Sequence, residues 1–119
     1  MFARDPFHRV DVRRSDREVT VHVGGVLVAR STRPLAVFET GMPVRWYLPR
    51  EDVLVALDPT ATSTTCAYKG AASYWSLTTA DGEPHEDVAW SYETPLPDAV
   101  ALAHAVAFYP DRSEISVGV

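Results

Sequence analysis

Apolar and polar residues alternate with a period of two along most of the chain, which is the pattern of half-buried β-strands. The run Val19-Thr20-Val21-His22-Val23 shows the alternation most clearly, and Gly24-Gly25 follows it as a hairpin turn. Proline, glycine and acidic residues separate further runs of the same kind. The pattern predicts strands over residues 10–12, 19–23, 26–29, 35–39, 44–48, 53–57, 71–79, 87–93, 105–109 and 115–117.

The segments between these strands are short and polar. The expected connections are one helical turn at 51–53, a polar loop at 58–65, a hairpin turn at Asp81-Gly82, and a short helix that Asp98 caps and that ends near His104. We see no repeat or linker. The chain is therefore expected to form one domain over residues 1–119, mainly β and at most α+β, with a single short helix.

The hairpin around Asp81-Gly82 carries a cluster of aromatic residues. If the numbers of paired residues add up to an odd sum, Trp75 and Trp90 lie on one face, with Tyr92 beside Trp90 and Tyr74 on the other face. An even sum reverses this assignment. The cluster is either the wall of an aromatic pocket or cross-strand packing within a core.

The net charge of −5 is divided unevenly along the chain. Residues 1–50 hold nine arginines against five acidic residues, whereas residues 51–119 hold Lys69 and Arg112 against eleven. The basic residues are interleaved with acidic ones and form no run, so no nucleic-acid partner is expected. No stretch approaches the roughly 20 apolar residues of a membrane span. With a single cysteine and no apolar signal core, we expect no membrane association and a cytoplasmic location.

Cys66 and Lys69 are the only cysteine and the only lysine, and they share one segment beside the aromatic hairpin. Lys69 can meet a ligand carboxylate or phosphate, or act as a nucleophile or base when desolvated. The structural alternative is an ion pair with Glu39, Asp52 or another acid. Cys66 is either a thiolate activated by the nearby cation or a small buried residue.

A second group of polar residues combines an acid, a guanidinium and a phenol over two predicted strands. It consists of Glu39, Arg45, Tyr47 and Asp52. Turn chemistry and surface charge are the alternative explanation. The four histidines are scattered, and neither Cys-x-x-Cys nor His-x-x-x-His spacing occurs, so the sequence predicts no metal site and no cofactor.

Several linked motifs run through the chain. They are Glu-Thr-Gly at 39–41, Trp-Tyr-x-Pro-x-Glu-Asp-Val at 46–53, Cys-x-Tyr-Lys-Gly-x-Ala-x-Tyr-Trp at 66–75, Ala-Trp-x-Tyr-x-x-Pro at 89–95 and Val-Ala-Phe-Tyr-Pro at 106–110. With these motifs the chain resembles the domain of unknown function family numbered 427, sometimes labelled as nucleotidyltransferase-type. The resemblance implies a small fold similar to the tent-like half-barrels built from two sheets at an angle.

The resemblance implies no zinc, because the paired cysteines that hold zinc in some tent-like proteins are absent here. The nucleotidyltransferase label has no support in the residues, since no Gly-Ser followed by paired metal-binding aspartates occurs.

Three functions remain open on the sequence alone. The first is binding of a small polar or anionic molecule in an aromatic-lined pocket near Lys69, by Glu39, Arg45, Tyr47, Lys69, Tyr74, Trp75, Trp90 and Tyr92. The second is an enzyme in which Lys69 or Cys66 is the nucleophile and Glu39 or Asp52 the acid or base. The third is a structural or interaction module whose aromatic residues are all core. For the first, we expect Glu39, Tyr47, Lys69 and Trp90 to surround one site.

Overall fold

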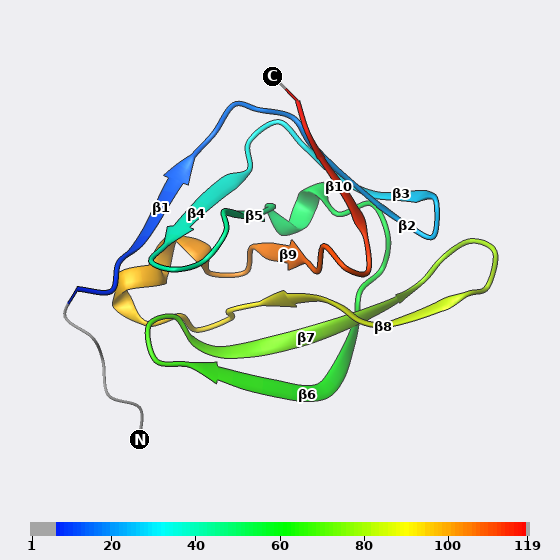
Figure 1. Cartoon of the computed structure of the whole chain (residues 1–119). Coiled ribbons are helices and arrows are strands. Elements are labelled where there is room, and N and C mark those ends of the chain that lie inside the picture. The colour runs from blue at the N-terminus through cyan, green and yellow to red at the C-terminus, as the bar shows by residue number, and fades with distance from the viewer. Residues whose placement is uncertain (1–6, 119) are drawn as a thin grey trace.

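The computed structural model describes residues 7–118 of the chain, which form ten strands and two 3-10 helices (Figure 1). The strands are β1 (Val10–Arg14), β2 (Val19–Val23), β3 (Val26–Ser31), β4 (Leu35–Glu39), β5 (Arg45–Tyr47), β6 (Asp58–Cys66), β7 (Gly70–Thr78), β8 (Pro84–Ser91), β9 (Val106–Phe108) and β10 (Glu114–Val117). The helices are η1 (Arg50–Asp52) and η2 (Pro97–Leu102). None of the helices within residues 7–118 is long and apolar enough to cross a bilayer.

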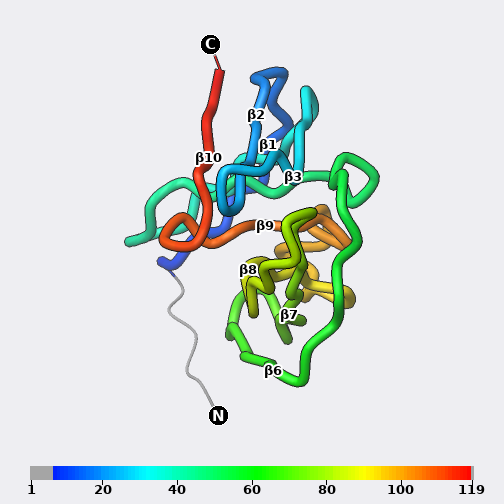
Figure 2. Tube along the Cα trace, turned by 90° about the vertical axis from the view of Figure 1, so that its right-hand side faces the viewer, coloured from blue at the N-terminus to red at the C-terminus, as the bar shows by residue number. Residues whose placement is uncertain are grey.

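The strands pair into three antiparallel sheets, with the orders β1-β4-β5, β10-β2-β3 and β6-β7-β8-β9. In Figure 1 the two three-stranded sheets slope down from a common upper edge, and β6, β7 and β8 lie below them. Figure 2 shows β9 between these upper and lower layers. The prediction of a mainly β fold is confirmed. The family resemblance implied two sheets at an angle. The structure has three sheets, because no strand of the β1-β4-β5 sheet pairs with a strand of the β10-β2-β3 sheet.

Two segments differ from the prediction. The polar loop expected at 58–65 is strand β6, whose β-branched threonines pair with β7 and stay exposed because β6 is an edge strand. The strand expected at 53–57 is irregular: Val53 makes one isolated bridge to Ala29, and Leu54 points outward. The expected short helix is the 3-10 helix η2, interrupted by non-helical dihedral angles at Ala99.

The four-stranded sheet separates two hydrophobic cores. On β9, Val106 and Phe108 belong to the first core and Ala107 to the second, because alternate residues point to opposite faces. The first core is built mainly on the β10-β2-β3 sheet and contains Val19, Val21, Val23, Val28, Leu48 and Ala89. The second core lies against the β1-β4-β5 sheet and η2 and contains Val37, Tyr47, Trp90, Tyr92 and Leu102.

The hairpin has the even register, so Trp75 and Trp90 lie on opposite faces of the sheet. Thr78 pairs with Pro84 across a five-residue loop, and this odd loop length gives an even register. Tyr74 therefore lies opposite Trp90, and Trp75 lies opposite Ala89 on the other face. A β-bulge between Trp75 and Leu77 shifts the pairing by two residues, so the numbers of paired residues still add up to an even sum.

Leu48 joins the β1-β4-β5 sheet to the four-stranded sheet. Its backbone N–H donates to the Val106 carbonyl at 2.8 Å, and the Val106 N–H donates back at 2.8 Å. Its side chain is 1% exposed and lies in the first core.

Leu48→Ala leaves a cavity at this junction, and we expect it to lower the free energy of unfolding by about 2–5 kcal/mol. Leu54→Ala is the matched control, because Leu54 is 59% exposed, and its effect should stay within about 0.5 kcal/mol. Urea unfolding measures both variants. Equal effects of the two changes would show that the junction is not packed as described.

Candidate functional site

The candidate site lies where the β1-β4-β5 sheet faces the four-stranded sheet. Val37 pairs with Arg45 and Leu35 with Tyr47, so alternate residues of β4 and β5 point to this inner face. Glu39 follows the same alternation from Val37. The local pattern of strand residues thus places an acid, a guanidinium and a phenol on one surface.

A buried ion pair joins the two sheets at this site. Lys69, in the turn between β6 and β7, donates from Nζ to Glu39 Oε1. His8 Nε2 lies 2.8 Å from Glu39 Oε2, and the His8 ring stacks on Tyr68 with centroids 3.8 Å apart. The side chains of Lys69 and Glu39 are each 11% exposed. Glu39 therefore connects β4, the β6–β7 turn and the segment that precedes β1.

The turn that presents Lys69 is held by its backbone. The Leu96 N–H donates to the Lys69 carbonyl at 2.9 Å. Gly70 follows with φ of 109°, a conformation that favours glycine, and a Cβ there would lie 3.4 Å from the Leu96 nitrogen. The positive φ, rather than a lack of space beside the Thr94–Leu96 connection, therefore favours glycine after Lys69.

The electrostatics of the site follow from burial and the ion pair. Burial raises the pKa of Glu39, but the hydrogen bonds from Lys69 and His8 outweigh it, so the pKa of Glu39 lies below its ordinary value. Burial raises the pKa of Tyr47 to about 12, and the nearby Glu39 carboxylate adds to this rise. Burial also raises the pKa of Tyr92. Both phenols are therefore neutral hydroxyls at physiological pH.

Three aromatic rings form a continuous row across the inner face, and we call Trp90, Tyr109 and Tyr74 the aromatic row. Trp90 and Tyr109 have ring centroids 4.4 Å apart, and Tyr109 stacks on Tyr74 at 6.2 Å. At the buried end, Trp90 Nε1 donates to the Tyr47 hydroxyl at 3.0 Å. At the other end the Tyr109 hydroxyl donates to that of Tyr74, 3.0 Å away, which lies 2.9 Å from the exposed Thr64 hydroxyl. The row thus runs from the core to the surface.

Two guanidinium groups lie over the aromatic row. The Cζ atom of Arg45 is 6.0 Å from the ring centroid of Trp90, and that of Arg112 is 5.8 Å from the centroid of Tyr109. Arg112 also donates to the backbone carbonyls of Glu86 and Asp87. Arg45 makes no ion pair with a carboxylate among residues 7–118.

Two predicted site residues lie elsewhere. Trp75 is on the opposite face of the sheet, where its Nε1 donates to Ser91 Oγ at 2.8 Å and Arg50 lies over its ring. Asp52, in η1, accepts a hydrogen bond from Ser31 and pairs with Arg33. The remaining predicted residues gather around the ion pair and the aromatic row: Glu39, Arg45, Tyr47, Cys66, Lys69, Tyr74, Trp90 and Tyr92.

Sequence reasoning missed His8, Tyr68, Tyr109 and Arg112. Tyr109 lies in the Val-Ala-Phe-Tyr-Pro motif and next to a predicted strand, so its alternation with Ala107 could have placed it on the inner face. His8 gave no such signal, because its partner Glu39 is 31 residues away.

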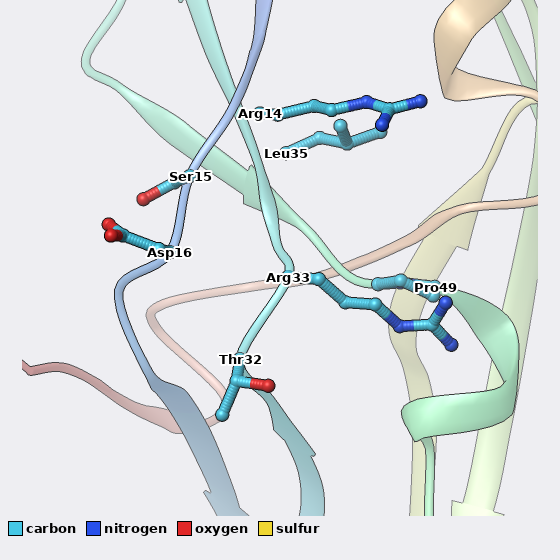
Figure 3. A pocket seen from close by; sticks show the side chains of 7 residues that line it. All are labelled: Arg14, Ser15, Asp16, Thr32, Arg33, Leu35 and Pro49. Atoms are coloured by element: carbon cyan, nitrogen blue, oxygen red, sulfur yellow. The ribbon is translucent and has the colours of Figure 1, made fainter.

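A hollow of about 780 Å³ lies outside this cluster, near the ends of β1 and β3 (Figure 3). Arg14 runs alongside Leu35 in this view, and Arg33 extends from the turn before β4. Arg33 is already paired with Glu51 and Asp52. The hollow is lined by none of the predicted binding residues. In the part of the chain that the structure describes, no group of three histidine, cysteine or acidic side chains is placed to hold a metal ion.

The pH dependence of stability tests the ion pair through Glu39→Gln. Because the pKa of Glu39 is lowered in the fold, its carboxylate stabilises the protein above the unfolded value of about 4.5, and this stabilisation is lost as the pH falls through the lowered pKa. We expect the difference in unfolding free energy between the two proteins to be largest near pH 7 and to shrink below about pH 4.5. Urea unfolding of both proteins at a series of pH values from 7 down to about 3 measures this difference.

Glu51→Gln is the control for this titration, because Glu51 is exposed and its pair with Arg33 is screened by solvent. Its effect should stay small at every pH. A pH-independent difference for Glu39→Gln would contradict the assignment of an ionised, buried Glu39.

Comparison with known protein families supports the resemblance that the sequence motifs indicated. No curated protein matches the chain. The family described as a domain of unknown function (DUF427) matches residues 11–118, which include β1 to β10 except for the first residue of β1. The chain therefore belongs to the DUF427 family, as the motifs around Glu39, Lys69, Trp90 and Tyr109 predicted.

Proposed function

We propose that the domain binds a small polar or anionic molecule against the aromatic row, with Arg45 as its main charged contact. The observation that carries this proposal is the position of Arg45: its guanidinium lies over Trp90 and has no carboxylate partner among the described residues. Trp90 itself is buried, so a planar anion would stack on the partly exposed rings of Tyr109 and Tyr74 at the outer end of the row and accept two hydrogen bonds from the guanidinium.

The hydroxyl groups of the site supply further polar contacts. Tyr74 and Tyr109 are only partly buried, and their hydroxyls form a chain with Thr64 that reaches the surface. Hydroxyl groups both donate and accept hydrogen bonds, so they suit a ligand that carries polar groups besides its charge. Arg112 over Tyr109 adds a second positive charge at this end of the row.

In this proposal Lys69 and Glu39 support the binding surface. The charge of Lys69 is met by Glu39, so Arg45 rather than Lys69 contacts the anion. Tyr47 links the ion pair to the aromatic row. The Glu39 carboxylate contributes to the raised pKa of the Tyr47 hydroxyl, and this hydroxyl accepts the hydrogen bond from Trp90. The ion pair thereby helps to fix the orientation of the indole against which Tyr109 packs and over which Arg45 lies.

The geometry favours binding over nucleophilic catalysis by Lys69 or Cys66. Lys69 would have to leave Glu39 before its amine could attack a substrate, and the pair is largely buried. Cys66 packs against the second core beside Tyr92. Asp52, the other proposed acid, is in η1 and pairs with Arg33.

The three indole N–H signals in a nitrogen–proton NMR spectrum offer a direct test. The probes are sodium benzoate, a planar carboxylate, and inorganic phosphate. We expect benzoate to shift the Trp90 signal and leave Trp75 unchanged, because Trp75 is on the opposite face of the sheet. Arg45→Gln should weaken this binding about tenfold or more, the loss expected for a hydrogen bond to a charged group.

Arg30→Gln is the matched control, since Arg30 is an exposed arginine paired with Glu18 away from the aromatic row. It should leave benzoate binding unchanged. The proposal fails if neither probe shifts the Trp90 signal, or if the shift persists at the same concentrations in Arg45→Gln.

A further inference from the structure

The β1-β4-β5 sheet has a second, outer face that the proposed ligand site does not use. Ala36 pairs with Trp46, and Phe38 pairs with Asp11, so these residues point away from Glu39 and Tyr47. Two hollows of about 440 and 460 Å³ lie on this outer face. They share Arg13, Phe38 and Val44 and form one groove, which we call the outer groove.

The outer groove has an apolar floor that is partly open to solvent. Ala36 is buried and Trp46 half-buried, whereas Phe38 is 44%, Val44 42% and Met42 51% exposed. Exposed large apolar residues gathered in one place, with polar residues around them, mark interaction sites on soluble proteins.

Four arginines line the same groove against two acids, Asp11 and Glu39, and the Glu39 carboxylate is already engaged by Lys69 and His8. Arg13, Arg14 and Arg17 make no ion pair with a carboxylate among residues 7–118, and Arg9 meets only Asp11, at 3.6 Å. The protein has a net charge of −5, so acidic residues are abundant elsewhere in the chain.

Several arginines outside the groove are matched by acids. Arg30 pairs with Glu18, and Arg50 pairs with Glu93. Arg45 and Arg112, over the aromatic row, also lack a carboxylate partner among the described residues, but the outer groove gathers three such arginines, Arg13, Arg14 and Arg17, in one place.

We infer that the outer groove binds an extended, acidic peptide segment of a partner protein. Apolar side chains of the peptide would lie on Phe38 and Val44, and its carboxylates would pair with Arg13 and Arg17. In an extended peptide, alternate side chains point in opposite directions, so a segment that alternates acidic and apolar residues can meet both the floor and the arginine wall.

The shape of the groove favours a peptide over other anionic partners. Its floor is recessed at Ala36 and Trp46, whereas a lipid surface is met by protruding apolar side chains. Single-stranded nucleic acid needs a series of aromatic rings on which successive bases stack. Here the lining holds two rings, Phe38 and the half-buried Trp46, together with the aliphatic side chains of Ala36, Met42 and Val44.

Fluorescence anisotropy tests the inference on the full chain with a labelled synthetic peptide of about ten residues that alternates glutamate and leucine. We expect this peptide to bind, and binding to weaken as salt rises. The Arg13→Gln/Arg17→Gln double variant should weaken binding at least about tenfold, and Phe38→Ser should weaken it as well. Arg30→Gln and Leu54→Ser, which change an arginine and an exposed leucine outside the groove, should bind as the unchanged protein does.

Several results would overturn the inference. One is the absence of binding; another is equal binding of a peptide in which glutamine replaces glutamate. Preferential binding of a single-stranded oligonucleotide or of phosphatidylserine vesicles would assign the groove to nucleic acid or to a membrane instead. Thermal melting of each variant shows that it is folded, and a second floor variant, Val44→Ser, replaces Phe38→Ser if that protein does not fold.

Discussion

The ion pair between Lys69 and Glu39 joins two sheets at a point where no strand ladder connects them. Glu39 ends β4, and Lys69 lies in the β6–β7 turn of the four-stranded sheet. Burying two opposite charges is costly unless they are paired closely, so the pair constrains both elements to one relative position. His8 uses the second oxygen of Glu39 and brings the segment before β1 to the same place.

The position of the aromatic row depends on this constraint. Glu39 and Tyr47 lie on the same face of neighbouring strands, and the Tyr47 hydroxyl holds the indole of Trp90. Trp90 in turn contacts Tyr109 and lies beneath Arg45. A displacement of the four-stranded sheet would therefore separate the indole of Trp90 from the Tyr47 hydroxyl and from the guanidinium of Arg45, which is the main charged contact of the proposed ligand.

The alternation of residues in β4 and β5 gives this small domain two different surfaces. Odd-numbered positions, such as Glu39 and Tyr47, face the aromatic row, and even-numbered positions, such as Phe38 and Trp46, face the outer groove. The proposed ligand would contact Arg45 on β5, and the proposed peptide would contact Phe38 on the neighbouring strand β4. Such a sheet places both proposed activities on one rigid element.

The sequence predicted most strands because their side chains alternate, as in residues 19–23, and it brought Glu39, Tyr47, Lys69 and Trp90 together through the family motifs. It could not predict the pairing of Trp75, because register depends on a five-residue loop and a bulge that periodicity does not reveal. Strand β6 was missed because its exposed threonines have no apolar alternation, and such a polar run has the same sequence pattern as a loop. The contact of His8 with Glu39 arises only when the sheets are assembled.

A double-mutant cycle on Lys69 and Glu39 tests the central claim most directly. Lys69→Met leaves the buried Glu39 carboxylate with His8 as its remaining partner, and Glu39→Gln leaves the buried ammonium of Lys69 without its carboxylate, so each change should destabilise the fold by about 3 kcal/mol in urea unfolding. Together they remove both charges, and the double variant should lose clearly less than the sum, with a coupling energy of about 2 kcal/mol or more. Additive losses, with a coupling energy below about 0.5 kcal/mol, would show that the pair does not hold the two sheets together.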